Sequence, residues 1–203
     1  MHRINSFNTM ATSYKKINHH ILSLETKQNL VKFILDNPEL VIGYYVSPSG
    51  EKTYSSTPID GWKQIGLKKI DIEHFQEIVR SDVEHLEKII TIPFSQTVLY
   101  TNPHGKVPSH TDSRITERQC SIMVPLYPNL DDYQPTLLWP KYPDTSVCEV
   151  LNGVDCPALI NLQTHHSMSN NNHIRFNFQI YFGLPYTYEI VSQMIDAGTL
   201  FRE

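Results

Sequence analysis

The texture of the chain changes at Pro93, and the residues after this point restrict the fold strongly. Short runs of β-branched and aromatic residues alternate from there with Pro, Asn, Asp and Gly at intervals of about ten residues. This spacing is typical of a β-sandwich or barrel. We expect eight strands, a number that suits a jelly roll, at residues 95–101, 107–112, 119–126, 135–140, 146–151, 157–161, 163–168 and 174–182.

The residues before Pro93 predict helices that support this sheet. Apolar side chains recur at helical spacing between Leu24 and Asp36, and Pro38 ends the pattern. A longer helix is expected to begin at Asp71, whose side chain can cap it, and to end before Pro93. The expected fold class is therefore mainly β with flanking helices around a jelly-roll core.

Three further segments complete the expected outline. Residues 1–20 are polar and irregular, which predicts a loose arm. Gly, Pro and Ser between residues 44 and 58 predict turns around a brief hairpin. Residues 188–197 predict a closing helical turn.

Composition narrows the class of protein. The 17 basic and 21 acidic residues give a net charge of -4, so no global basic field predicts a nucleic-acid partner. Three cysteines without a CxxC pair argue against a disulfide framework and a cysteine zinc site. No stretch approaches the roughly 18 apolar residues that a membrane span needs. We expect a soluble, cytoplasmic protein with no membrane partner.

The tripeptide His110-Thr111-Asp112 is the first element of a predicted metal site. On an extended strand, positions i and i+2 point to the same side, so His110 and Asp112 can converge on one ion. His166 follows as a third ligand from a distant strand. Two imidazoles and one carboxylate suit non-haem Fe(II) with open positions. A lone H-x-D tripeptide could be an ordinary turn, and the prediction depends on the whole set occurring in order.

The pattern resembles the 2-oxoglutarate-dependent Fe(II) dioxygenases over about residues 95–185, which implies a double-stranded β-helix core of the jelly-roll or cupin-like kind. That family has an H-x-D on an early core strand, a distal His near a late strand and an Arg about ten residues later. His110-Thr111-Asp112, His166 and Arg175 resemble these elements, and residues 103–110 (PHGKVPSH) resemble the usual lead-in. Residues 166–170 (HSMSN) ahead of 175–178 (RFNF) are most similar to aspartyl/asparaginyl hydroxylases and related prolyl-hydroxylase-like proteins.

This resemblance implies specific roles. His110, Asp112 and His166 would bind Fe(II), with 2-oxoglutarate and O2 as cosubstrates at the remaining positions. Arg175 would bind the distal carboxylate of 2-oxoglutarate through its planar fork, assisted by Asn177. The strand expected at residues 174–182 agrees with these roles. Its polar residues lie on one side and its apolar residues on the other, and a polar side suits a cosubstrate pocket.

Several alternatives stay open on the sequence alone. His165 competes with His166, because neighbouring strand residues face opposite sides and only one can bind. Arg114 and Arg118 could reach a substrate carboxylate or could be exposed surface arginines. The aromatic residues Tyr100, Tyr127 and Trp139 could line a substrate entrance or simply pack. A zinc hydrolase and a non-catalytic cupin-like binding module remain as other protein classes.

The expected function is hydroxylation of an amino-acid or peptidyl side chain, with release of succinate and CO2. The partner would then be a small-molecule or peptidyl substrate. We expect a single domain over residues 1–203. Its parts would be N-terminal helical support at 1–92, a jelly-roll catalytic core at 93–185 and a C-terminal closing segment at 186–203.

Overall fold

Two antiparallel sheets form the body of the protein in the computed structural model, which describes residues 12–55, 57, 59–70, 76–101, 106–112, 116–127, 135–169 and 175–202. The large sheet has the order β1 (Tyr14–Lys16), β10 (Ala158–Asn161), β7 (Cys120–Tyr127), β12 (Arg175–Phe182), β5 (Ser95–Thr101), β4 (Lys63–Ile70), β2 (Ile42–Val46) and β3 (Lys52–Ser55). The small sheet has the order β6 (Lys106–His110), β11 (His165–Ser169), β8 (Thr136–Trp139) and β9 (Glu149–Leu151).

From β5 onward, the chain passes repeatedly from one sheet to the other, as a jelly roll requires. The fold class expected from the sequence, a double-stranded β-helix with flanking helices, is confirmed. All eight strands predicted after Pro93 are present. The main differences are at their ends, because β6 stops at His110 and β9 begins only at Glu149.

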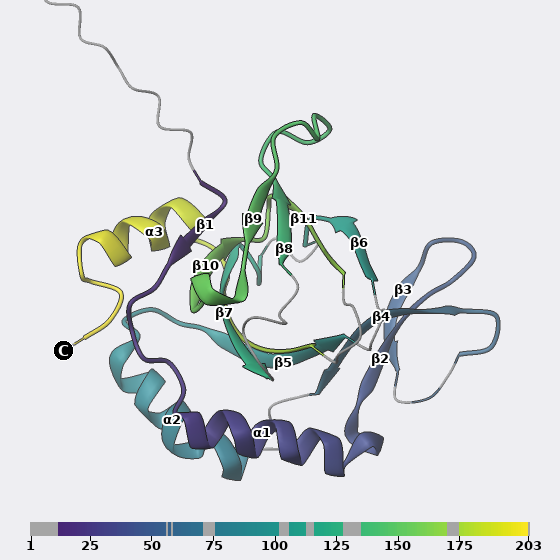
Figure 1. Cartoon of the computed structure of the whole chain (residues 1–203), viewed down its shortest axis with the longest axis horizontal. Coiled ribbons are helices and arrows are strands. Elements are labelled where there is room, and N and C mark those ends of the chain that lie inside the picture. The colour runs from purple at the N-terminus through teal and green to yellow at the C-terminus, as the bar shows by residue number, and fades with distance from the viewer. Residues whose placement is uncertain are drawn as a thin grey trace, which may run out of the picture.

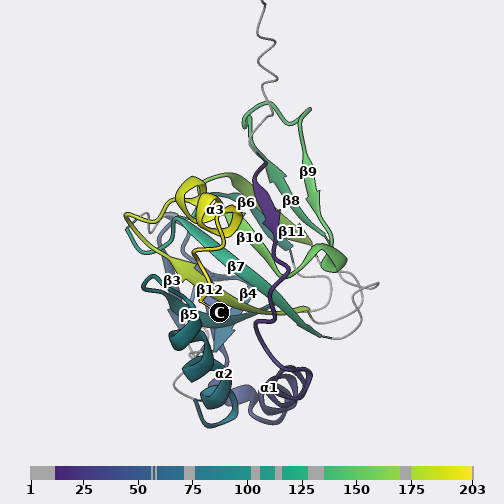
Figure 2. The same cartoon turned by 90° about the vertical axis from the view of Figure 1, so that its left-hand side faces the viewer.

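Helices α1 (Leu24–Asp36) and α2 (Gln76–Ile89) cover the face of the large sheet that points away from the small sheet (Figures 1 and 2). The ends of α1 follow from its sequence. Ser23 caps its first turn by accepting a hydrogen bond from the Thr26 backbone N–H at 3.0 Å, and the Asn37 side-chain amide donates to the Phe33 carbonyl at 2.8 Å. The Asp71 cap expected for α2 lies outside the described residues.

Three shorter helices complete the described elements. They are the 3₁₀ helices η1 (Pro38–Leu40) and η4 (Gly153–Asp155), and α3 (Tyr188–Asp196), where a closing helical turn was expected. Figure 1 shows α3 beside β1. Among the described helices, none has both the length and the apolar character needed to cross a membrane.

The central strand β12 separates an apolar layer from a polar interior. All eight of its residues are buried. Phe176, Phe178 and Ile180 pack in one cluster with apolar residues of α1 and α2, so they face the helices. Because side chains alternate along a strand, Arg175 and Asn177 face the space between the two sheets. The alternation expected from the sequence therefore places polar side chains inside the barrel.

The N-terminal half contributes strands that the sequence pattern did not indicate. The expected loose arm is wrong for Tyr14–Lys16, which pair with β10 as β1, the edge strand of the large sheet. Strand β4 was also missed, although β2 and β3 form the expected hairpin. Both missed strands owe their structure to backbone pairing with distant partners, since β1 is short and β4 is rich in lysine.

Candidate metal centre

His110 and His166 are cross-strand neighbours in the small sheet. His110 is the last residue of β6, and the antiparallel register places its Cα opposite that of His166 on β11. Side chains at such positions share one face, and the two imidazole rings lie with their centroids 4.4 Å apart. Strand pairing alone thus joins two residues that are far apart in the sequence.

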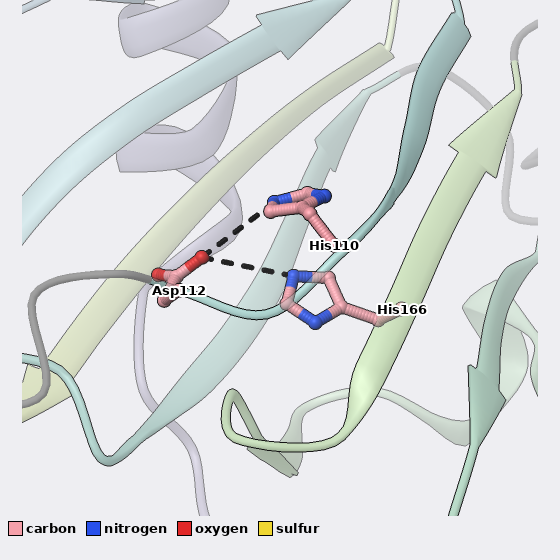
Figure 3. A group of neighbouring side chains, drawn as sticks. All are labelled: His110, Asp112 and His166. Carbon is pink, nitrogen blue, oxygen red and sulfur yellow. Dashed lines mark ion pairs between the residues drawn. The ribbon is translucent and has the colours of Figure 1, made fainter. Parts of the chain in front are cut away.

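Asp112 completes the group from the segment after β6. Its backbone N–H donates to the Leu162 carbonyl at 3.0 Å, which holds the chain beside the cluster after the strand has ended. Asp112 Oδ1 lies 3.6 Å from His110 Nε2 and 3.8 Å from His166 Nε2 (Figure 3). Potential ligand atoms of all three residues lie within 4.8 Å of one another, so a single cation could contact all of them.

The ring nitrogens that face away from Asp112 are held by backbone carbonyls. Nδ1 of His110 lies 2.8 Å from the Pro108 carbonyl oxygen, and Nδ1 of His166 lies 2.9 Å from that of Thr164. A carbonyl oxygen only accepts, so we assign the ring proton to Nδ1 in each case. Nε2 of each neutral ring then keeps its lone pair for a metal. This outer hydrogen bond is the usual way in which proteins orient metal-binding histidines.

The charge states of the cluster also suit a cation. Burial lowers the pKa of His166, and the neighbouring His110 lowers it further, so the ring is neutral at pH 7. For Asp112, burial alone would raise the pKa. Interactions with His110, His166 and Arg118 outweigh burial and hold the pKa of Asp112 below its ordinary value. At neutral pH the site therefore presents a neutral His166 imidazole and an ionised carboxylate.

His165 points away from this cluster. Its ring stacks on that of Tyr142 with a centroid distance of 3.7 Å, and its Nδ1 lies 3.4 Å from Ser109 Oγ. Trp139 is its cross-strand partner on β8, so the Trp139 side chain shares this outward face. The geometry thus brings His166, and not its neighbour, together with His110 and Asp112.

Arg175 lies at the start of β12 with 2% of its surface exposed. Its Nη2 donates to Thr136 Oγ1 at 2.7 Å and contacts Met123 Sδ at 3.7 Å. Asn177, two residues along the same face of the strand, is 1% exposed. A neutral hydroxyl and a sulfur atom are thus two of the groups that hold the guanidinium inside the protein.

A cavity of about 550 Å³ connects these features. His110, Asp112 and His166 line it, and so do Thr136 and Met123, the residues that the Arg175 guanidinium contacts. Leu99, Ile160, Leu162 and Met168 contribute apolar side chains to the same lining. A small polar ligand that entered the cavity could contact the three-residue cluster and lie close to the buried arginine.

The cavity also has lining residues that sequence reasoning assigned elsewhere or missed. Arg118 is half-buried, so the exposed-arginine interpretation is wrong for it. Tyr44, Tyr54 and Lys69 reach the cavity from β2, β3 and β4. No sequence signal placed them there, because β4, which connects the β2–β3 hairpin to β5 in the large sheet, was not recognised. Arg114, like the side chains of Tyr100 and Tyr127, lies outside the described part of the chain.

Comparison with solved structures reveals the same fold. The chain is similar to a prolyl hydroxylase from Trichoplax adhaerens, solved with a peptide fragment of the hypoxia inducible factor oxygen degradation domain. The TM-score is 0.53, with 13% identity over 85% of this chain and 84% of that one. EvdMO1 is also similar, with a TM-score of 0.50 and 10% identity over 86% of this chain and 48% of that one. Neither a protein-family model nor a curated protein sequence matches the chain.

Replacement of one histidine at a time tests the geometry of the cluster. We expect Mn(II), at about 100 times its Kd, to stabilise the parent protein and His165→Ala by roughly 2.7 kcal/mol, a rise of roughly 5–11 °C in Tm. His166→Ala should fold but lose most of this shift, because one ligand is gone. Thermal unfolding with and without Mn(II) gives the answer. Loss of the shift in His165→Ala with retention in His166→Ala would contradict the assignment.

Proposed function

We propose that this protein is an Fe(II)- and 2-oxoglutarate-dependent dioxygenase that hydroxylates an amino-acid or peptidyl side chain and releases succinate and CO2. One observation carries the proposal. Two Nε2 atoms and one carboxylate converge in a cavity that is also lined by Thr136 and Met123, the two residues that the buried Arg175 guanidinium contacts. The first group suits non-haem iron, and the arginine suits a keto acid that carries a second carboxylate.

The side chains of the cluster have the orientation that this role needs. His110 and His166 would hold Fe(II) through Nε2, and Asp112 would hold it through a carboxylate oxygen. The Pro108 and Thr164 carbonyls prevent either ring from turning its Nδ1 toward the ion. Three protein ligands leave open positions, at which bound Fe(II) supplies the chemistry of keto-acid chelation and O2 activation.

Arg175 is suited to bind the distal carboxylate of 2-oxoglutarate. Its guanidinium stays charged, and its planar fork can donate two parallel hydrogen bonds to a carboxylate. The Thr136 hydroxyl fixes one nitrogen of that fork at 2.7 Å, which limits the orientations that the group can adopt. We assign Asn177, buried on the same face of β12, a supporting role beside Arg175.

Apolar side chains in the cavity lining would strengthen this interaction. Leu99, Ile160 and Leu162 line the same cavity as the metal cluster. A charge-assisted hydrogen bond is worth more in such surroundings, because the local dielectric constant is lower than in water. The same apolar wall would keep water from reacting at the metal in place of the substrate.

Two other functions fit the structure less well. A zinc hydrolase could use the same three ligands, but hydrolysis has no need for a buried carboxylate anchor such as Arg175. A non-catalytic binding module would not need three ligand groups that are oriented by backbone carbonyls. The shared fold with a prolyl hydroxylase solved with a peptide supports a small-molecule or peptidyl substrate.

A spectroscopic experiment tests the proposal most simply. Protein loaded with Fe(II) without oxygen should develop a weak visible charge-transfer band when 2-oxoglutarate is added. The band arises from bidentate chelation by the keto acid, which needs two open metal positions. Protein loaded with Zn(II) is the control, since Zn(II) is not redox active. Absence of the band in a sample shown to contain iron would favour the hydrolase.

Arg175→Lys tests the carboxylate anchor separately from the metal site. The substitution keeps the charge but replaces a rigid fork with a flexible point charge. Loss of one charge-assisted hydrogen bond costs on the order of 1.5–3 kcal/mol. The dissociation constant for 2-oxoglutarate should therefore rise roughly 10- to 150-fold.

Two titrations of the same variant separate the possible outcomes. The affinity for Mn(II) should stay near that of the parent, because Arg175 is not a predicted ligand. Arg80→Lys, at an exposed position on α2, is a matched control that should change neither constant. Parent-like binding of 2-oxoglutarate by Arg175→Lys would contradict the role given to this residue.

A further inference from the structure

The two carboxylate oxygens of Asp112 have different partners. Oδ1 is the atom that lies 3.6 Å from His110 Nε2 and 3.8 Å from His166 Nε2, whereas Oδ2 lies 3.8 Å from Arg118 Nη1. Figure 3 shows the second oxygen of Asp112 pointing away from both rings. One oxygen thus faces the metal cluster, and the other faces a cation.

Arg118 is held in this position by an aromatic ring. Its guanidinium carbon lies 4.4 Å from the centroid of the Tyr181 ring. Tyr181 is buried on β12, with 3% of its surface exposed. A guanidinium group is attracted to the face of such a ring and can stack on it. The Arg118 side chain is itself only 24% exposed, so it stays beside Asp112 and does not extend into water.

The surroundings of Arg118 keep it charged and paired. Burial alone would lower the pKa of the guanidinium, but four neighbours outweigh burial and raise it. In decreasing order of effect, these neighbours are Tyr181, Asp112, Tyr54 and Glu117. Of the two carboxylates among them, Asp112 therefore has the larger effect on Arg118. The two side chains form an ion pair at the edge of the metal cluster.

The backbones of Asp112 and Arg118 are joined by the side chain of Gln163, in the turn between β10 and β11. Its Nε2 donates to the Arg118 carbonyl at 2.9 Å and reaches the Asp112 carbonyl at 3.5 Å. Leu162 in the same turn accepts the Asp112 backbone N–H at 3.0 Å. The turn therefore places the two side chains beside each other independently of the contact between their charged groups.

The partner of Oδ2 matters for the metal. Carboxylates bind metal ions through one oxygen or through both. In the proposed function, the keto acid needs two open metal positions and O2 needs another, and a second oxygen from Asp112 would take one of them. Pairing with Arg118 opposes this, because Oδ2 would leave a partly buried cation without its partner.

We propose that Arg118 is a positioning residue that holds Oδ2 of Asp112 and so restricts Asp112 to one ligand oxygen, which keeps metal positions open for the keto acid and O2. This inference rests on the function proposed above, because it takes the three-residue cluster as the metal site. It gives Arg118 a role that acts through Asp112 and not through contact with the substrate.

The number of water molecules on bound Mn(II) tests this role without any cosubstrate. Water enriched in oxygen-17 broadens the electron paramagnetic resonance lines of Mn(II) in proportion to the bound waters. In Arg118→Gln, we expect about one water fewer than in the parent, because Oδ2 replaces it. Arg118→Lys keeps a cation for Oδ2 and should keep the parent number. Arg80→Gln, at an exposed position on α2, is the control for the change in net charge.

Two affinities distinguish this role from a general loss of structure. The Kd of Arg118→Gln for Mn(II) should equal that of the parent or fall, because a nearby positive charge is removed and a ligand oxygen is gained. The Kd of the Mn(II)-loaded variant for 2-oxoglutarate, measured by calorimetry without oxygen, should rise roughly 10-fold or more. Damage to the site as a whole would instead weaken the binding of both.

Three results in folded protein would overturn the inference. The first is an equal number of waters in Arg118→Gln and the parent. If 2-oxoglutarate binding is weakened all the same, Arg118 contacts the cosubstrate carboxylate at the metal directly. The second is a loss of Mn(II) binding in Arg118→Gln. The third is an Arg118→Lys variant that behaves like Arg118→Gln in both experiments.

Two further points keep the test decisive. Arg118→Met can keep a contact with Tyr181 through its sulfur atom, and it replaces Arg118→Gln if that variant does not fold. A parent protein that binds Mn(II) but not 2-oxoglutarate would contradict the proposed function, while the water count still decides the role of Arg118. A parent protein that does not bind Mn(II) would overturn both.

Discussion

The pairing of β6 with β11 is the constraint on which the candidate site depends. It places His110 opposite His166, and this register alone brings the two rings together. Hydrogen bonds along the strands fix the register, and a slip of one residue would turn His165 toward the cluster in place of His166. Asp112 then needs only the short segment after β6 and the hydrogen bond to Leu162.

The large sheet supports this arrangement because its central strand has two different faces. On one face of β12, the phenylalanines Phe176 and Phe178 are fully enclosed with the helices, and burying each such side chain contributes roughly 1.5–3 kcal/mol. That rigid layer makes it possible to keep Arg175 inside the barrel on the opposite face, where desolvation of a charge is costly. Stability from the helical face and chemistry on the inner face thus come from the same eight residues.

The sequence predicted the core better than it predicted the cavity lining contributed by β2, β3 and β4, for a physical reason. Strand periodicity after Pro93 is local, and so is the i, i+2 relation of His110 and Asp112, so both could be recognised in short windows. The choice of His166 needed the resemblance to a family, because alternation alone leaves His165 equally possible. Lys69 was missed because β4 depends on pairing with β2 and β5, and local composition does not record such long-range contacts.

The central claim is that the protein uses a bound iron ion and O2 to convert 2-oxoglutarate to succinate and CO2. Its most direct test is to measure succinate after incubation of the Fe(II)-loaded protein with 2-oxoglutarate in air. We predict that succinate forms, that an equal amount of CO2 is released, and that both cease when oxygen is removed or when Asp112 is replaced by alanine. If folded, iron-loaded protein forms no succinate under these conditions, the claim is contradicted.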